Sequence, residues 1–188
     1  MGIFKSSAQK TGKKNILLII GAVLAILGLL FACGCGKDRT EELSRMALTE
    51  ADLPGNYTLE YEHTETDFGE DNLAGVEIEY KVGFDRADGE VHVLEGIAIC
   101  LHPELVPSVD TWNINWQNMH GEYRVTELDE PNIGEYSSAT KWEHKYKEES
   151  FLLLSFSKDD KWVKLKAWGA DYEFLKSLGI KAERKVNQ

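Results

Sequence analysis

Residues 76–85 alternate between apolar side chains and side chains that are charged or small. This period of two is typical of a strand with one buried and one solvated face. Asp88-Gly89 then predicts a tight turn, because both residues tolerate the backbone angles of short hairpins, and residues 91–101 return beside the first strand. Since glycine weakens a strand locally, Glu95-Gly96 predicts a β-bulge in the returning strand.

Further strand patterns lie on either side of this hairpin. They are bounded by turn residues and are rich in β-branched, aromatic or other apolar side chains. They occupy residues 57–62, 137–146, 151–157 and 161–169. Together with the hairpin they predict an antiparallel sheet of about six strands.

Two segments show helical spacing instead. In the first, apolar residues recur at spacings of four, three, four and three, namely Leu105, Val109, Trp112, Trp116 and Met119. This predicts a covering helix over about 108–120 whose apolar stripe faces the sheet. In the second, Asp171 occupies an N-cap position before a C-terminal helix over about 171–186. Strands, a helix, more strands and a terminal helix indicate an α+β fold.

The longest uncharged run, residues 15–36, precedes all these elements and follows four lysines. At about 1.5 Å per helical residue, its apolar part covers about 30 Å, the thickness of a bilayer's hydrocarbon core. A plain secretory signal has a shorter apolar core. Two interpretations stay open: an uncleaved N-terminal transmembrane helix, or a lipoprotein signal cut before a lipidated Cys33, because residues 30–33 resemble a bacterial or archaeal lipobox.

Charge predicts the orientation of the chain. Of its 21 basic residues four lie before residue 15, and all 32 acidic residues follow residue 37, so the remainder has a formal charge of −15. Lysines beside an apolar segment favour a cytoplasmic N-terminus. We therefore expect a cytoplasmic segment at 1–14, a cell-membrane segment at 15–36, a spacer at 37–49 and an extracytoplasmic domain at 50–188. The acidic balance also argues against nucleic acid as a partner.

The sequence after the membrane segment contains no recognisable catalytic, cofactor or metal motif. No serine lies in a Gly-x-Ser-x-Gly elbow, and no Gly-rich phosphate loop occurs. The five histidines never recur at the three- or four-residue spacing that places two metal ligands on one helical face. Cys100, alone in this part of the sequence, lies in an apolar strand pattern and is expected to be buried and inert.

The last predicted strand carries two tryptophans and two lysines on one side. Its core-facing residues are Val163, Leu165 and Ala167, and its opposite face has Trp162, Lys164, Lys166 and Trp168. Aromatic and basic stripes can stack sugars or receive anionic groups, so these four residues and Trp142 form the predicted ligand surface. The alternative is that a helix covers the two tryptophans and the lysine stems lie over apolar neighbours.

Two short motifs occur at fixed places in this order of elements. Residues 48–57 read Leu-Thr-Glu-Ala-Asp-Leu-Pro-Gly-Asn-Tyr before the first strand, and residues 131–137 read Pro-Asn-Ile-Gly-Glu-Tyr-Ser before a three-strand meander. The chain thereby resembles small archaeal and bacterial membrane-attached surface proteins with a PsbP-like or LpqN-like α+β domain. That resemblance implies a sheet covered by helices, in an exported or membrane-attached domain without known catalysis. It assigns no functional residues.

These features favour a membrane-tethered extracytoplasmic module that interacts with another envelope protein or a glycan. Asn56 begins an Asn-x-Thr acceptor and is a candidate glycosylation site on an exported chain. The alternative from another functional class is an extracellular enzyme, or an accessory subunit of an envelope enzyme.

Overall fold

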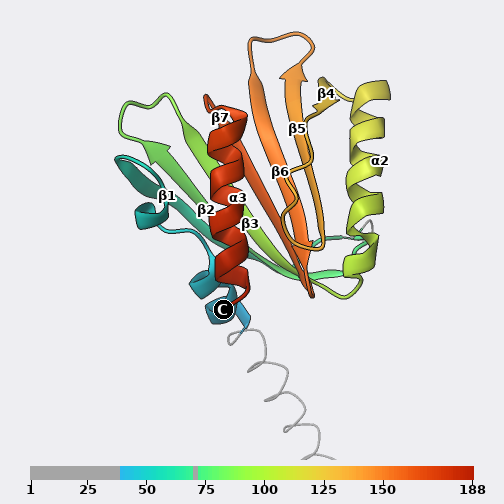
Figure 1. Cartoon of the computed structure of the whole chain (residues 1–188). Helices are drawn as coiled ribbons and strands as arrows, with labels where there is room; N and C mark the ends of the chain where they lie inside the picture. Colours follow the sequence, from blue (N-terminus) through green and yellow to red (C-terminus); the bar gives the residue numbers. More distant parts are fainter. Residues whose placement is uncertain (1–38, 70–71) are drawn as a thin grey trace, which may run out of the picture. The chain divides into compact units, whose positions relative to one another are not determined.

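The structure is a computed structural model that describes residues 39–69 and 72–188 (Figure 1). The run at 15–36, including Cys33, lies outside the described residues. Among those described, no helix is long and apolar enough to cross a membrane. A helix at 39–46 is followed by η1 (Glu50–Asp52), β1 (Tyr57–Glu65), β2 (Val76–Arg86), β3 (His92–Cys100), η2 (Pro103–Leu105), α2 (Val106–Met119), β4 (Tyr123–Glu127), β5 (Tyr136–His144), β6 (Ser150–Lys158), β7 (Lys161–Trp168) and α3 (Tyr172–Val186).

The seven strands form one antiparallel sheet in the order β1-β2-β3-β7-β6-β5-β4. The chain builds one meander from β1 to β3 and a second from β4 to β7, and β3 pairs with β7 where the two meet. The α+β fold class is therefore confirmed. The strand β4 was not predicted, because it has five residues and one buried position, Val125, which makes its pattern too short to stand out.

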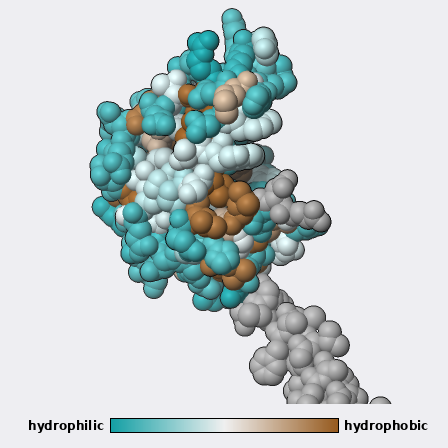
Figure 2. All heavy atoms as spheres, turned by 90° about the vertical axis from the view of Figure 1, so that its right-hand side faces the viewer, coloured by the Kyte–Doolittle hydropathy of each residue, from teal (hydrophilic) through white to brown (hydrophobic). Residues whose placement is uncertain are grey.

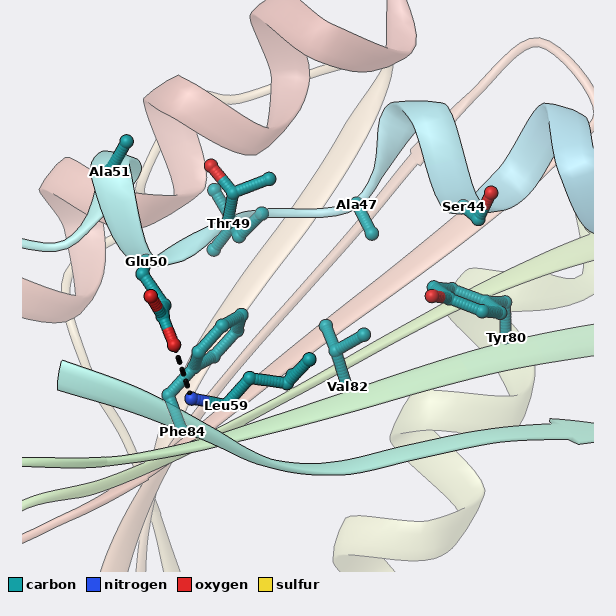
Figure 3. A pocket seen from close by; sticks show the side chains of 10 residues that line it. Ser44, Ala47, Thr49, Glu50, Ala51, Leu59, Tyr80, Val82 and Phe84 are labelled. Carbon is teal, nitrogen blue, oxygen red and sulfur yellow. Dashed lines mark hydrogen bonds between the residues drawn. The ribbon is translucent and has the colours of Figure 1, made fainter.

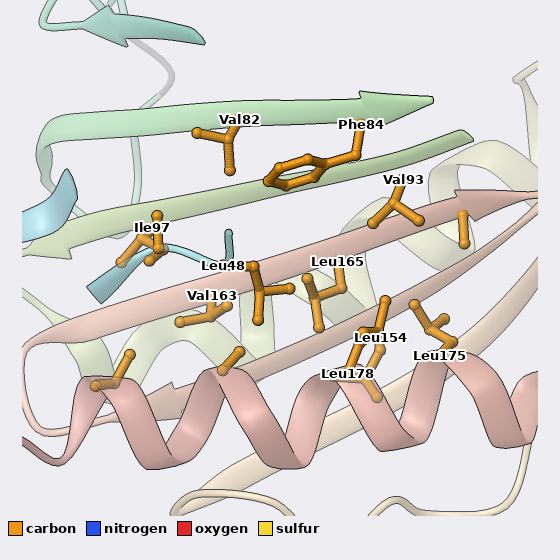
Figure 4. Packing of buried hydrophobic residues seen from close by; sticks show 14 of the residues in the cluster. Leu48, Val82, Phe84, Val93, Ile97, Leu154, Val163, Leu165, Leu175 and Leu178 are labelled. Carbon is orange, nitrogen blue, oxygen red and sulfur yellow. The ribbon is translucent and has the colours of Figure 1, made fainter. Parts of the chain in front are cut away.

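The helix α3 covers one face of the sheet (Figure 1). Asp171 caps it as predicted, because its carboxylate accepts a hydrogen bond from Phe174 N at 2.8 Å. Leu175 and Leu178 are fully buried on the inner side of α3 and point toward Leu154 on β6 (Figure 4). Full burial of each leucine contributes about 1.5–3 kcal/mol, so this face is the main core of the domain.

Residues 39–53 complete the same layer. Leu43, Ala47 and Leu48 are buried in the core with α3, so the described part of the expected spacer is packed into the domain. Polar contacts hold it there: Lys185 Nζ donates to Ala47 O at 2.9 Å, and Leu48 N donates to the Glu95 carboxylate at 2.6 Å.

The predicted β-bulge at Glu95-Gly96 is wrong. The pairing of β3 with both neighbouring strands continues through these residues without a shift, and the registers of β1 and β2 shift elsewhere, at Leu59/Tyr61 and Val76/Ile78. Glu95 instead points into the core, where burial raises the pKa of its carboxyl to about 8. Gly96 therefore lies on the opposite face of the sheet, where it leaves room for another side chain.

The helix α2 lies over part of that opposite face, but its predicted orientation is wrong. Trp112, Trp116 and Met119 are 57%, 43% and 69% exposed, whereas Val106 and Asp110 are buried against the sheet. The physical reason is the surface beneath α2. It carries the hydroxyl side chains of Ser138, Thr140 and Ser155, which require polar partners such as Asp110. A mixed side of the helix therefore packs there, with Val106 and Val109 beside Asp110, and the rest of the predicted stripe is left in solvent.

Candidate ligand groove

We call the face of the sheet opposite α3 the second face. A hollow lies on the part of it that α2 leaves uncovered. Its cavity has a volume of about 270 Å³, and we call it the sheet groove; its lining residues are Glu79, Lys81, Leu94, Gly96, Leu153, Lys164 and Lys166. A smaller cavity of about 110 Å³ between α2 and the sheet shares Leu153 and Lys164 with it. The sheet groove thus continues toward the buried polar side of α2.

A carboxylate held between two lysines forms the floor of the sheet groove. Glu79 lies across Gly96, since a Cβ at position 96 would come within 2.7 Å of Glu79 Oε1. The Glu79 carboxylate is 3.0 Å from Lys81 Nζ and 3.4 Å from Lys164 Nζ. Lys81 Nζ also lies 2.5 Å from the Glu65 carboxylate, so Lys81 is shared between two carboxylates, and both lysines have an acidic partner.

Lys166 is placed differently from the other two lysines. Its Nζ lies 4.2 Å from the centroid of the Phe151 ring and 5.2 Å from that of the Trp168 ring. Within the described part of the chain, no carboxylate lies in ion-pair distance of this ammonium group. Burial lowers the pKa of Lys166, the charge of Glu149 opposes this shift, and the charge of Lys164 adds to it. The groove therefore presents one partly desolvated cation that has no direct carboxylate partner within the described residues.

Flat aromatic rings continue from Lys166 along the second face. Phe151 stacks on Trp142 with ring centroids 5.5 Å apart and an interplanar angle of 15°, and it also contacts Trp168 at 5.5 Å. Tyr123 meets both Trp142 and Phe151 edge to face. Trp142 and Trp168 are half-buried, so each leaves part of its ring accessible beside the groove.

Trp162 does not belong to this accessible surface, and the expectation that its ring is exposed is wrong. It is 6% exposed and packs with Ala98, Cys100 and Val106 under the first turn of α2. Its Nε1 donates to Ser155 Oγ at 2.7 Å. The alternative that a helix covers the tryptophans is thus correct for Trp162, while Trp168 stays partly accessible.

Asp110 is a buried carboxylate at the α2 end of the groove. Ser138 Oγ donates to its Oδ2 at 3.3 Å, and the hydroxyls of Ser155 and Tyr136 also contact it. Burial raises the pKa of Asp110, and these hydrogen bonds oppose the shift. The serine hydroxyls are therefore engaged in holding Asp110 and Trp162, and neither is a free nucleophile.

The structure places the remaining candidate residues away from this groove. Asn56 is exposed immediately before β1, which leaves its glycosylation as a prediction. Cys100 is buried as expected, and burial raises the pKa of its thiol to about 11. In the described ranges, no three histidine, cysteine, aspartate or glutamate side chains are arranged to hold a metal ion.

A third and larger cavity lies on the α3 side of the sheet between residues 44–51 and strands β1 and β2 (Figure 3). It measures about 510 Å³ and is lined mainly by apolar side chains, including Leu59, Val82 and Phe84. Its acidic residue, Glu50, already accepts a hydrogen bond from Leu59 N at 2.8 Å. No lysine or arginine of the described chain lines this cavity, in contrast to the sheet groove.

The sequence analysis identified the exposed partners of the groove but not its floor. Lys164, Lys166, Trp168 and Trp142 come together as predicted, because alternate residues of neighbouring strands share one face. Glu79, Gly96 and Phe151 were missed. The strand order, with β3 beside β7, shows that Glu79 and Gly96 face the two lysines, whereas Phe151 reaches Lys166 through the pairing of β6 with β7.

The fold of the domain is also found in a known structure. The crystal structure of the extracellular domain of PknH from Mycobacterium tuberculosis matches it with a TM-score of 0.58 at 13% sequence identity. The match covers 79% of this chain and 96% of that one. No protein-family model matches the chain, and no curated protein matches its sequence. The comparison shows a shared fold, and the predicted PsbP-like or LpqN-like relationship stays a prediction.

Proposed function

We propose that this chain is a membrane-tethered extracytoplasmic binding module of the cell envelope. The run at 15–36 and the formal charge of −15 after it support the location, as does the shared fold with an extracellular domain. The sheet groove is the binding site. Either form of tether, a transmembrane helix or a lipid on Cys33, is compatible with this function.

The ligand that the groove suits is an acidic sugar, meaning a sugar ring that carries a carboxylate or phosphate. The observation that carries this proposal is Lys166, a cation without a carboxylate partner in the described residues, set between the rings of Phe151 and Trp168. A partly desolvated ammonium group favours an anion, and an accessible tryptophan face favours an apolar sugar face. Glu79 disfavours anions deeper in the groove, so the ligand's charge would lie at Lys166.

Binding rather than catalysis is the better-supported function. A hydrolase needs a nucleophile activated by a base, yet the Ser155 hydroxyl accepts from Trp162 and the Ser138 hydroxyl donates to Asp110. Both hydroxyls therefore stabilise the junction between α2 and the sheet.

The ligand class is tested with the full chain in detergent micelles. Glucuronate, glucose and acetate would be titrated at constant ionic strength while tryptophan fluorescence is recorded, since Trp142 and Trp168 lie beside the groove. We expect glucuronate to bind and to bind more tightly than either partial probe. Acetate or glucose binding as tightly as glucuronate, or no glucuronate binding at all, would contradict an acidic-sugar site.

A matched pair of variants locates the site. Lys166→Met keeps the length of the side chain but removes its charge, and should weaken glucuronate binding about tenfold, or about 1.4 kcal/mol. Lys176→Met is the control, because Lys176 also lies near an aromatic ring, that of Tyr172, but on α3 at the opposite face. Equal effects of the two substitutions would place the site elsewhere.

The tether is tested by the intact mass of protein extracted from membranes. Full length without lipid indicates the transmembrane helix, whereas loss of residues 1–32 with added diacylglycerol indicates a lipidated Cys33. Recovery of a shortened, lipid-free chain in the soluble fraction would contradict both forms of tether.

A further inference from the structure

The outer side of α2 is an apolar stripe without a partner in the described domain. Leu105, Trp112, Trp116 and Met119 are all exposed along it, and we call these four residues the α2 stripe. Trp112 and Trp116 stack on one another, with ring centroids 6.5 Å apart and an interplanar angle of 26°. The two rings thus present one continuous surface rather than two separate side chains.

Two further leucines are exposed near the start of α2. Leu73 and Leu101 are 61% and 60% exposed, and Leu101 pairs with Gly75 by a backbone hydrogen bond of 3.0 Å. Figure 2 faces the α2 side of the molecule and shows apolar side chains gathered in one patch there. With the α2 stripe they expose roughly 700 Å² of side-chain surface, more than the ~300–600 Å² of the largest patch on a typical monomer.

We propose that the α2 stripe is a homodimer interface, in which two copies of this chain pair their α2 helices antiparallel about a twofold axis. A twofold contact uses the same patch on both copies and, where it covers Leu73 and Leu101 together with the stripe, buries up to roughly 1,400 Å² in total, within the range of a standard interface. Charge repulsion is small at this contact despite the acidic domain. The only charged residue of α2 is Asp110, and it is buried toward the sheet.

The direction of the helix dipole and the charged groups at the two ends of α2 favour the antiparallel arrangement. Glu104 is an exposed carboxylate just before α2 begins. Lys145 lies at the other end, where its Nζ donates to Gln117 O at 3.2 Å and Gly121 O at 2.8 Å. Antiparallel pairing opposes the two helix dipoles, and it brings Glu104 of each copy toward the end of the other where Lys145 lies beside the exposed Glu122.

The test uses the full chain in its membrane, with a benzophenone amino acid in place of Asn115, an exposed α2 residue beside Trp116. Irradiation should produce a product at twice the monomer mass. Trp112→Ser combined with Trp116→Ser should reduce this product at least tenfold. Because both rings are exposed, the double variant should fold normally, which its unchanged thermal melting would verify.

The same label at Glu173, exposed on α3, is the matched control and should give no dimer. The proposal is overturned if the Asn115 label reacts only with lipid, only with a different protein, or equally well from Glu173. Glucuronate binding should be the same in the tryptophan variant and the parent chain, because the α2 stripe faces away from the sheet groove. The dimer proposal and the ligand-site proposal are therefore tested independently of each other.

Discussion

The helices on the two faces of the sheet differ in which side chains they bury. On the α3 face, Leu175, Leu178 and Ala182 are fully buried, and the polar side of α3 is turned outward. On the other face, α2 turns Asp110 inward and leaves Trp112 and Trp116 in solvent. The first face supplies the core that stabilises the fold, and the second face carries the exposed surfaces suited to binding.

The polarity of the sheet surface beneath a helix therefore decides which side of the helix is buried. The α3 helix packs on Leu154 and Leu165, which offer only apolar contact. The α2 helix packs near Ser138 and Ser155, whose hydroxyls require polar partners. An apolar stripe therefore predicts which side of a helix packs on a sheet only where the facing strand residues are apolar too.

The largest effect should come from removing a core side chain of α3. Leu178→Ala deletes fully buried methyl groups next to Leu154 and should lower the free energy of unfolding by about 2–5 kcal/mol. Met119→Ala on α2 removes an exposed side chain and should change it by less than about 0.5 kcal/mol. Urea unfolding of both variants measures the difference, and equal losses would contradict the contrast between the faces.

A smaller effect, and one that depends on pH, should come from Glu95 within the α3-side core. Burial in the folded protein raises the pKa of the Glu95 carboxyl to about 8, whereas the ordinary value of a glutamate carboxyl is 4.5. The folded state therefore binds more protons between these values. Stability from this group is fully present below about pH 4.5 and is lost as the pH rises toward 8, by on the order of a few kcal/mol.

Glu95→Gln keeps an acceptor for Leu48 N but cannot ionise. The difference in unfolding free energy between this variant and the parent chain should therefore grow in favour of the variant from pH 5 to pH 8. Urea unfolding across that range checks it, with Glu173→Gln on the exposed side of α3 as the control. A constant difference across the range would show that Glu95 is not held protonated by the core.

The smallest effect on stability should come from the floor of the sheet groove. Gly96→Ala brings a Cβ to 2.7 Å from Glu79 Oε1, so the carboxylate must move from between its two lysines, at a cost of about 1–2 kcal/mol. In a Glu79→Ala background the same substitution should cost almost nothing, because its neighbour is gone. A double-mutant cycle of unfolding free energies measures this coupling, and additive losses would contradict the described contact.

Local sequence patterns predicted much of the fold. Asp171 and the apolar spacing of residues 175–186 agree with each other, and α3 lies where they indicated. The alternation at 76–85 likewise became β2, and Asp88-Gly89 became a turn with a positive φ of 71° at Gly89. These elements were predictable because each depends on interactions within a few neighbouring residues.

The candidate site was only partly predictable, because its residues meet through the order of the strands. Lys164 and Lys166 share a face by alternation alone, but their relation to Glu79 depends on β7 lying beside β3 rather than at an edge. The same holds for Glu95, because a charged residue followed by a glycine gives no reason to expect a buried core position. Its burial follows from unbroken pairing on both sides of β3.

We propose that the second face binds an anion at Lys166, and amine footprinting of the full chain is the sharpest test of this site. An acetylating reagent would be applied with and without saturating glucuronate, and the modification of each lysine measured by mass spectrometry. We predict that glucuronate slows acetylation of Lys166 about tenfold while Lys176 on α3 reacts unchanged. Equal protection of both lysines, or no protection of Lys166, would contradict the claim.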